Sequence, residues 1–344
     1  MFARILFLFA LLAAASPLQA GRVQTLFQAE VDAAGRDTAS RDAALSLALE
    51  EVLLRLTGST DSLATPEAQG LLKKPGRFVE QFRFRETSAD AGRPEQLSLW
   101  IQFDGVALAR EVRAAGLPYW GRERPDLLLW LAIDDRGQRY LMSETVEPGA
   151  TGARAAGRHH GLPLTLPLMD LEDQRAIQFT DVWGGFMGTV AAASRRYRPQ
   201  VVLTGRLERR SASGDWRTAW QLTDGNNSQS WKGHAASLDE AVDRGLGDAA
   251  EWLAVRYAVV SGDSGMHSLV VEEVSSLEDY ARVSAYLGSL SPVDKINVLR
   301  AEDREVEFSL KLSADASSLQ QLITLGRVLQ PIETDVPWRY RLNP

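Results

Sequence analysis

Three aspartates are the residues whose type and position best suit acid–base chemistry. Asp134 and Asp135 directly follow the apolar run 127–133, and Asp170 lies further along the chain. Functional groups of α/β folds often stand where a buried strand ends. Carboxylates gathered in one cleft there could activate water, which makes a hydrolase or carbohydrate-acting enzyme one hypothesis. The order Asp-Asp-Arg-Gly over 134–137 is also that of a turn, in which aspartates serve the backbone, and we favour this interpretation.

Two adjacent histidines, His159 and His160, raise the question of a metal site. Side chains of adjacent residues diverge on a helix or a strand, so one ion cannot easily bind both. The recognised helical arrangement places two histidines four residues apart, beside a carboxylate. We therefore expect an exposed polar loop here and no metal site. His234 and His267 stand alone and are expected at surface or strand positions.

The tetrapeptide Gly-Asp-Ser-Gly over 262–265 has the order found around the nucleophile of trypsin-like proteases. A serine nucleophile needs a base, an orienting acid and a rigid site. Here the segment stands in a Gly/Ser-rich stretch between an expected helix and an expected strand, so we interpret it as a joint. The glycines at 184, 185 and 188 lack the Lys and Thr of a phosphate loop. The sequence thus predicts no catalytic residue and no cofactor.

Aromatic and arginine side chains gather where the chain passes from its first to its second expected domain, and such residues are enriched in protein interfaces. They are the candidate binding residues: Tyr119, Trp120, Arg122 and Arg124. Because the group occupies a joint, it either contacts another protein or locks two domains of this chain together. The nine tryptophans also suggest sugar binding. Trp216 and Trp220, however, share one strand face, which a buried core explains.

Composition excludes several classes of protein. The chain has 344 residues, 45% hydrophobic and 24% charged, as in ordinary globular proteins. Its formal charge of −7 argues against a general nucleic-acid binder, which needs a basic surface. The absence of cysteine excludes disulfides, thiolate metal sites and cysteine nucleophiles.

The first twenty residues have the layout of a secretory signal. Arg4 supplies a positive charge, residues 5–15 are apolar, and the stretch 16–20 ends in a small residue, Ala20. The apolar run is shorter than the roughly 20 residues that span a bilayer as a helix. We therefore expect cleavage near Ala20, a periplasmic location and a mature protein without a membrane span.

Hydrophobic periodicity divides the rest into three small units of mixed α+β and α/β class. The expected domains are residues 1–20 (signal peptide), 21–116 (N-terminal α+β domain), 117–260 (central α/β domain) and 261–344 (C-terminal domain). The N-terminal domain should have helices on an antiparallel sheet. The central domain should be a layered α/β structure that includes one helix over 183–197. The third has the βαββαβ order of a ferredoxin-like fold.

Several segments of the sequence resemble those of an uncharacterised proteobacterial family of exported proteins, domain-of-unknown-function family 2066. They are Gly-Leu-Pro-Tyr-Trp-Gly-Arg-Glu-Arg-Pro-Asp-Leu-Leu-Leu-Trp-Leu-Ala over 116–132, Gly-Leu-Pro-Leu-Thr-Leu-Pro over 161–167, and Leu-Glu-Asp-Tyr-Ala over 277–281 followed by Tyr286 and Leu287. The central unit, with Val-Val-Leu-Thr-Gly-Arg-Leu over 201–207, also looks like the N-terminal domain of TolB. Those relatives bind other envelope proteins, and this likeness implies an architecture only.

These observations favour an uncharacterised, exported, non-enzymatic protein that binds or scaffolds envelope proteins. The first alternative is a periplasmic hydrolase or carbohydrate-acting enzyme that uses Asp134, Asp135 and Asp170. The second is a ligand-binding sensor with a pocket between the central and C-terminal units. The sequence does not determine the partner, the ligand or the oligomeric state.

Overall fold

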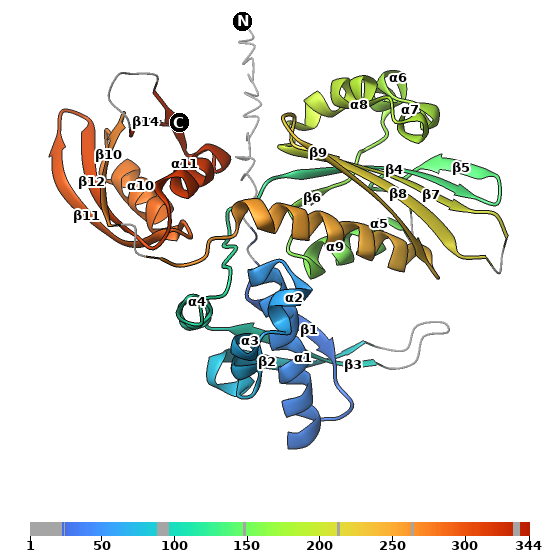
Figure 1. Cartoon of the computed structure of the whole chain (residues 1–344), viewed down its shortest axis with the longest axis horizontal. Helices are drawn as coiled ribbons and strands as arrows, with labels where there is room; N and C mark the ends of the chain where they lie inside the picture. Colours follow the sequence, from blue (N-terminus) through green and yellow to red (C-terminus); the bar gives the residue numbers. More distant parts are fainter. Residues whose placement is uncertain are drawn as a thin grey trace, which may run out of the picture.

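The chain folds as a mixed α+β protein whose described residues form three separate sheets (Figure 1). The computed structural model describes residues 23, 25–87, 96–146, 149–211, 214–262, 265–332 and 338–344. The expected signal peptide at 1–20 lies outside the described residues, as do Asp263 and Ser264 of the protease-like tetrapeptide.

The N-terminal unit has helices on one face of an antiparallel sheet of order β1-β3-β2, as predicted. Its elements are β1 (Gln28–Asp32), α1 (Thr38–Thr57), α2 (Thr60–Leu63), α3 (Pro66–Leu72), η1 (Pro75–Phe78), β2 (Val79–Thr87), β3 (Gln96–Phe103) and α4 (Gly105–Ala114). Leu99, Ile101 and Phe103 alternate along β3 and are fully buried under the helices.

Helix α1 has a capping residue at each end. The Asp37 carboxylate accepts a hydrogen bond from the Ser40 backbone N–H at the N-terminus. Gly58 adopts a left-handed conformation, with φ of 70°, at the C-terminus. Between these caps an apolar stripe that includes Leu49 and Leu53 is fully buried. Full burial of one such leucine contributes about 2 kcal/mol relative to an exposed position.

The central unit is a layered α/β structure around a sheet of order β5-β4-β7-β8-β9, with β6 beside β4. Its strands are β4 (Leu127–Asp135), β5 (Gln138–Leu141), β6 (Leu164–Thr165), β7 (Val201–Arg209), β8 (Trp216–Thr223) and β9 (Ser228–Ala235). Its helices are α5 (Gly149–His159), α6 (Leu171–Ala176), α7 (Phe179–Gly184), α8 (Met187–Ser194), η2 (Arg195–Tyr197) and α9 (Leu238–Tyr257). The core between the sheet and α5 and α9 is separate from the core under α6–α8, so β4 is buried on both faces.

The single helix expected over 183–197 is wrong. The structure has α7, then a break, then α8 and η2. Gly185 ends α7 in a left-handed conformation with φ of 71°. A helix cannot continue through such a residue. Apolar spacing alone did not reveal this stop.

The C-terminal unit begins with the predicted βαββα order and has two short strands after its second helix. Its last strand runs parallel to its first, which differs from the antiparallel sheet of a ferredoxin-like fold. Its elements are β10 (Met266–Glu272), α10 (Leu277–Ser289), β11 (Val293–Glu302), β12 (Glu305–Leu312), α11 (Ala316–Leu325), β13 (Leu329–Pro331) and β14 (Arg339–Leu342). The strand order is β11-β12-β10-β14, with β10 parallel to β14 and the short β13 added at the edge. None of the helices in the described part of the chain combines the length and the apolar character needed to cross a bilayer.

Candidate functional site

The four candidate binding residues contact this chain itself, at the junction of its units. Trp120 is fully buried, and its backbone N–H donates to the Leu56 carbonyl at the end of α1 (2.6 Å). Tyr119 pairs with Val259, which follows α9, in an isolated backbone bridge. The half-buried Arg122 guanidinium lies 5.2 Å from the centre of the Phe27 ring.

Arg124 is the centre of this junction. It is 1% exposed, and its guanidinium donates to the backbone carbonyls of Arg55 (2.6 Å), Trp120 (2.8 Å), Gly121 (2.9 Å) and Gly161 (3.1 Å). Burial lowers the pKa of Arg124 to about 9, so it stays charged at neutral pH and the carbonyl dipoles replace water around it. Arg124 and Trp120 therefore present almost no surface to another molecule.

Arg55 makes a second set of bonds across the same junction. Its guanidinium donates to the carbonyls of Gln28 on β1 and His159 at the end of α5, and to the Glu51 carboxylate one turn earlier on α1. These hydrogen bonds connect the N-terminal unit to the end of α5, where the two histidines lie.

The aspartates of the hydrolase hypothesis are held by separate partners. Asp134 accepts from Gly137 N–H (2.8 Å) and Arg139 Nε (2.8 Å), so it closes the β4–β5 turn, as the turn interpretation predicted. Asp135 forms two hydrogen bonds with Arg209 of β7. The arginines beside them hold the pKa of both carboxyls below the usual range.

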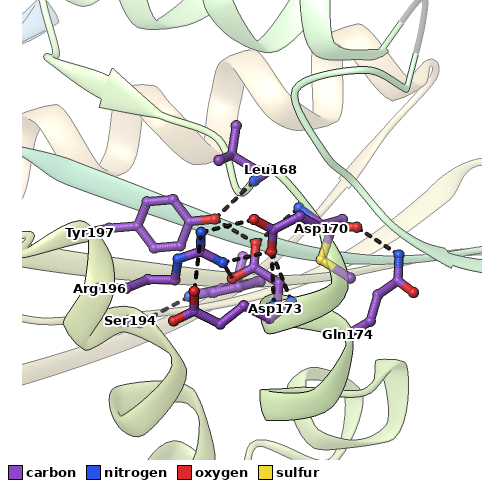
Figure 2. Close-up of polar contacts among 10 residues, drawn as sticks. Leu168, Asp170, Asp173, Gln174, Ser194, Arg196 and Tyr197 are labelled. Carbon is purple, nitrogen blue, oxygen red and sulfur yellow. Dashed lines mark hydrogen bonds and ion pairs between the residues drawn. The ribbon is translucent and has the colours of Figure 1, made fainter. Parts of the chain in front are cut away.

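Asp170 belongs to a different network, on the α6–α8 side of the sheet (Figure 2). It caps α6 through the N–H groups of Glu172 and Asp173, and the Arg196 guanidinium binds both Asp170 (2.7 Å) and the fully buried Asp173 (2.9 Å). The Tyr197 hydroxyl donates to Asp173 and accepts from Leu168 N–H. Arg196 also holds the pKa of Asp170 far below its usual range. This network fixes α6 to η2 and does not include Asp134 or Asp135.

Trp216 and Trp220 are core residues, as the strand pattern predicted, with exposures of 2% and 3%. Trp220 stacks with Trp231 of β9 at a centroid distance of 6.5 Å. A Cβ atom on Gly245 of α9 would lie 2.2 Å from the Trp220 ring. The glycine therefore lets α9 approach the sheet this closely.

His159 and His160 come together, contrary to the expectation of an exposed polar loop. Their ring centroids are 4.8 Å apart at an interplanar angle of 89°. Helix α5 ends at His159, and the chain then turns through Gly161, whose φ is 66°. His160 directly follows the last helical residue, and its backbone N–H still donates to the Ala156 carbonyl (3.0 Å). The expectation of an exposed loop is wrong because the pair lies at the end of α5, where His160 packs against Asp243 of α9.

Asp243 of α9 completes this histidine cluster. Its carboxylate lies 3.1 Å from His160 Nε2, and one ligand atom from each of His159, His160 and Asp243 lies within 4.8 Å of the others. On the other side, Glu51 Oε1 of α1 lies 3.7 Å from His159 Nδ1. The cluster therefore joins three helices: α1, α5 and α9.

Charge pairing perturbs the titration of these groups. The Glu51 carboxylate raises the pKa of His159, and the hydrogen bond from His160 lowers the pKa of Asp243. Burial alone would raise the pKa of Glu51, but the facing His159 and Arg55 outweigh it and lower this pKa. Perturbed titratable groups beside a cavity mark candidate functional sites.

Two cavities lie on either side of the cluster, and Asp243 lines both. The smaller, about 380 Å³, is lined by His160, the Trp220–Trp231 pair and residues of α9. One of these is Asp248, whose pKa is raised by burial and by the neighbouring Glu251. The larger, about 970 Å³, lies between the N-terminal sheet and helices α5 and α9. Both lie between the first two units, whereas the sensor hypothesis placed its pocket between the second and third.

Comparison with known families gives one match. Residues 20–121 match the profile of a family described as a domain of unknown function, DUF8605. No curated protein matches the chain. The expected resemblance to domain-of-unknown-function family 2066 is therefore wrong, because the matching family is a different one. The likeness of the central unit to the N-terminal domain of TolB finds no support either.

Sequence reasoning missed Glu51 and Asp243, the acidic members of the cluster. Both stand on long amphipathic helices, where an acidic residue on the polar side is unremarkable. Asp243 is 83 positions from His160, and a single sequence holds no signal that links them. The feature of the sequence that could have indicated a turn beside the histidine pair is Gly161, which directly follows it.

Proposed function

We propose that this protein is exported to a bacterial periplasm and acts as a non-enzymatic binding protein, with its partner in the cleft between the N-terminal and central units. The observation that carries the proposal is the charged cavity of about 970 Å³ between these units. Helices and strands form both of its walls: β1, β2, β3 and α1 on one side, and α5 and α9 on the other.

The lining of the cleft favours a basic partner. It carries five carboxylates against three arginines, a formal excess of two negative charges with histidine neutral: Glu30, Glu51, Asp239, Glu240 and Asp243 against Arg55, Arg85 and Arg158. Two of the arginines already have acidic partners, Arg55 with Glu51 and Arg85 with Glu30 (2.6 Å). Asp239, in contrast, is an exposed acid at the start of α9. A Lys- or Arg-rich segment of another envelope protein suits this surface.

The hydrolase alternative requires convergent carboxylates, and the geometry of the three aspartates does not favour it. Asp134 and Asp135 are bound by Arg139 and Arg209 beside the β4–β5 turn, and Asp170 is bound by Arg196 at α6. A general acid at neutral pH needs a raised pKa, and all three of these pKa values are lowered.

The proposal is tested by crosslinking in the native envelope, followed by binding of the captured protein to the purified chain. We expect Asp239→Lys to weaken this binding tenfold or more, because it places a cation in the acidic cleft. Glu278→Lys, an equal charge change at an exposed position on α10, should bind like the unchanged protein. Equal binding by both variants would contradict the cleft as the site. Turnover of a cell-wall or lipid substrate, abolished by one substitution, would contradict a non-enzymatic role.

Export is tested separately. Fractionation of cells should recover the protein in the periplasm, with an N-terminus near Gly21 by mass spectrometry. A full-length chain in the cytosol would refute this part.

A further inference from the structure

The histidine cluster has the composition of a transition-metal site. The chain has four histidines and no cysteine, and two of the four lie in this cluster together with Asp243. Two imidazoles and one carboxylate form a known zinc-binding set, and imidazole suits Zn²⁺, Cu²⁺ and Ni²⁺. Ca²⁺ and Mg²⁺ prefer all-oxygen ligands, so they are poor candidates here.

The distances are close to those that a metal requires. Bonds of about 2.0–2.1 Å in a tetrahedral site place ligand atoms about 3.4 Å apart. His160 Nε2 and Asp243 Oδ1 lie 3.1 Å apart, which already suits two adjacent ligands. The ligand atoms of all three residues lie within 4.8 Å of one another, so a shift of about 1.4 Å brings the widest pair to the spacing of bound ligands.

Glu51 lies where it could act as an outer carboxylate, which contacts a metal-binding histidine and not the ion itself. Histidines that bind metals usually give their second ring nitrogen to a carboxylate or carbonyl, which fixes the ring and its tautomer. Glu51 Oε1 lies 3.7 Å from His159 Nδ1, so a ring that binds an ion through Nε2 has this carboxylate beside its other nitrogen. Arg55 in turn holds Glu51 from the next turn of α1.

The cluster is also accessible. Its side chains are neither fully exposed nor sealed: the His160 side chain is 11% exposed, and those of His159 and Asp243 are 43% and 46% exposed. His159 and Asp243 line the larger cavity, so an ion bound here has an entry path and room for a water or a partner group as fourth ligand.

We infer that His159, His160 and Asp243 bind a divalent transition-metal ion of the zinc type, with Glu51 as the outer carboxylate that orients His159. The ion links the end of α5 to α9, and through Glu51 it reaches α1. This inference goes beyond the proposed partner and is tested without one, because metal binding is measured on the purified chain alone.

The test is Zn²⁺ binding by isothermal titration calorimetry on the purified chain, free of any histidine tag and dialysed against a chelator. We expect one Zn²⁺ per chain. His160→Ala and Asp243→Asn should each weaken binding at least tenfold, and Glu51→Gln by about tenfold, as outer-shell substitutions do. Co²⁺ in place of Zn²⁺ should give the visible absorption of a tetrahedral site.

Two control variants use the remaining histidines. His234 lines the smaller cavity and His267 lies on β10, so His234→Ala and His267→Ala should bind Zn²⁺ like the unchanged protein. Circular dichroism without metal verifies each fold, and His160→Gln replaces any alanine variant that has unfolded. The inference is overturned if the unchanged chain takes up no ion, if binding survives the double substitution of His159 and His160, or if the control variants lose binding equally.

Discussion

Arginine side chains fix the acidic groups that the sequence offered for chemistry. Asp134, Asp135 and Asp170 are each bound by an arginine of another element, which stabilises the ionised carboxylate. His159 and Asp243, in contrast, belong to a half-buried cluster of histidine and carboxylate groups beside a cavity. The partners that the fold gives a titratable residue therefore decide which of its charge states is favoured.

A pH dependence follows at this scale. Arg196 lowers the pKa of Asp170 in the folded protein, so this carboxyl contributes stability above its unfolded pKa of about 4. The contribution is lost as pH falls through the lower, folded pKa. Asp170→Asn removes this titration, and its loss of stability relative to the unchanged protein should be constant above pH 5 and shrink below pH 4. Urea unfolding across pH 2–7 measures this difference, and one that grows on acidification would contradict it.

At the scale of elements, caps and breaks are decided by single residues. Asp37 and Gly58 cap the two ends of α1. The break between α7 and α8 depends on Gly185, which apolar periodicity over 183–197 did not reveal. Conformational preference at one residue thus outweighed a favourable helical pattern.

The break gives a matched pair of substitutions. Gly185→Ala places a Cβ at a left-handed residue and should lower the free energy of unfolding by about 1 kcal/mol. Gly188→Ala, at an exposed position inside α8, should raise it by up to about 1 kcal/mol because alanine favours helix. Urea denaturation compares the two. Changes of equal sign would show that the left-handed turn is not what ends α7.

At the scale of the whole molecule, the junction around Arg124 couples the N-terminal unit to the central one. Arg124 donates to carbonyls from both units, and Gly58 at the end of α1 contacts Ala254 of α9 so closely that a Cβ there would lie 2.1 Å away. Since no carboxylate is among these acceptors, the buried cation depends on correctly placed backbone dipoles. The junction forms only when the units are packed together.

Removal of this cation should therefore uncouple the units. Arg124→Met leaves several buried carbonyls without a donor and should cost about 3 kcal/mol. We expect scanning calorimetry to show a first transition at lower temperature, from the N-terminal unit, separated from the rest. Arg110→Met, at an exposed position on α4, is the control and should change the midpoint little. A single unshifted transition for Arg124→Met would refute the coupling.

The sequence alone determined the local elements and their grouping. Three patterns are local: the amphipathic spacing in α1 and α9, the fully apolar β4, and the βαββαβ order after residue 265. Each depends only on residues within one or two turns or strands of one another. Such patterns predict which face is buried, and they yielded the mixed α+β architecture. They also assigned Asp134 correctly to a turn.

Only the tertiary structure brought Glu51, His159, His160 and Asp243 together. Their meeting depends on where α5 ends, on the turn at Gly161 and on the packing of α5 against α9 and α1. The direction of a side chain at a helix end is set by the turn and by contacts with distant segments. Local hydrophobic patterning carries no information about either, so the cluster could be found only once the three helices had been placed.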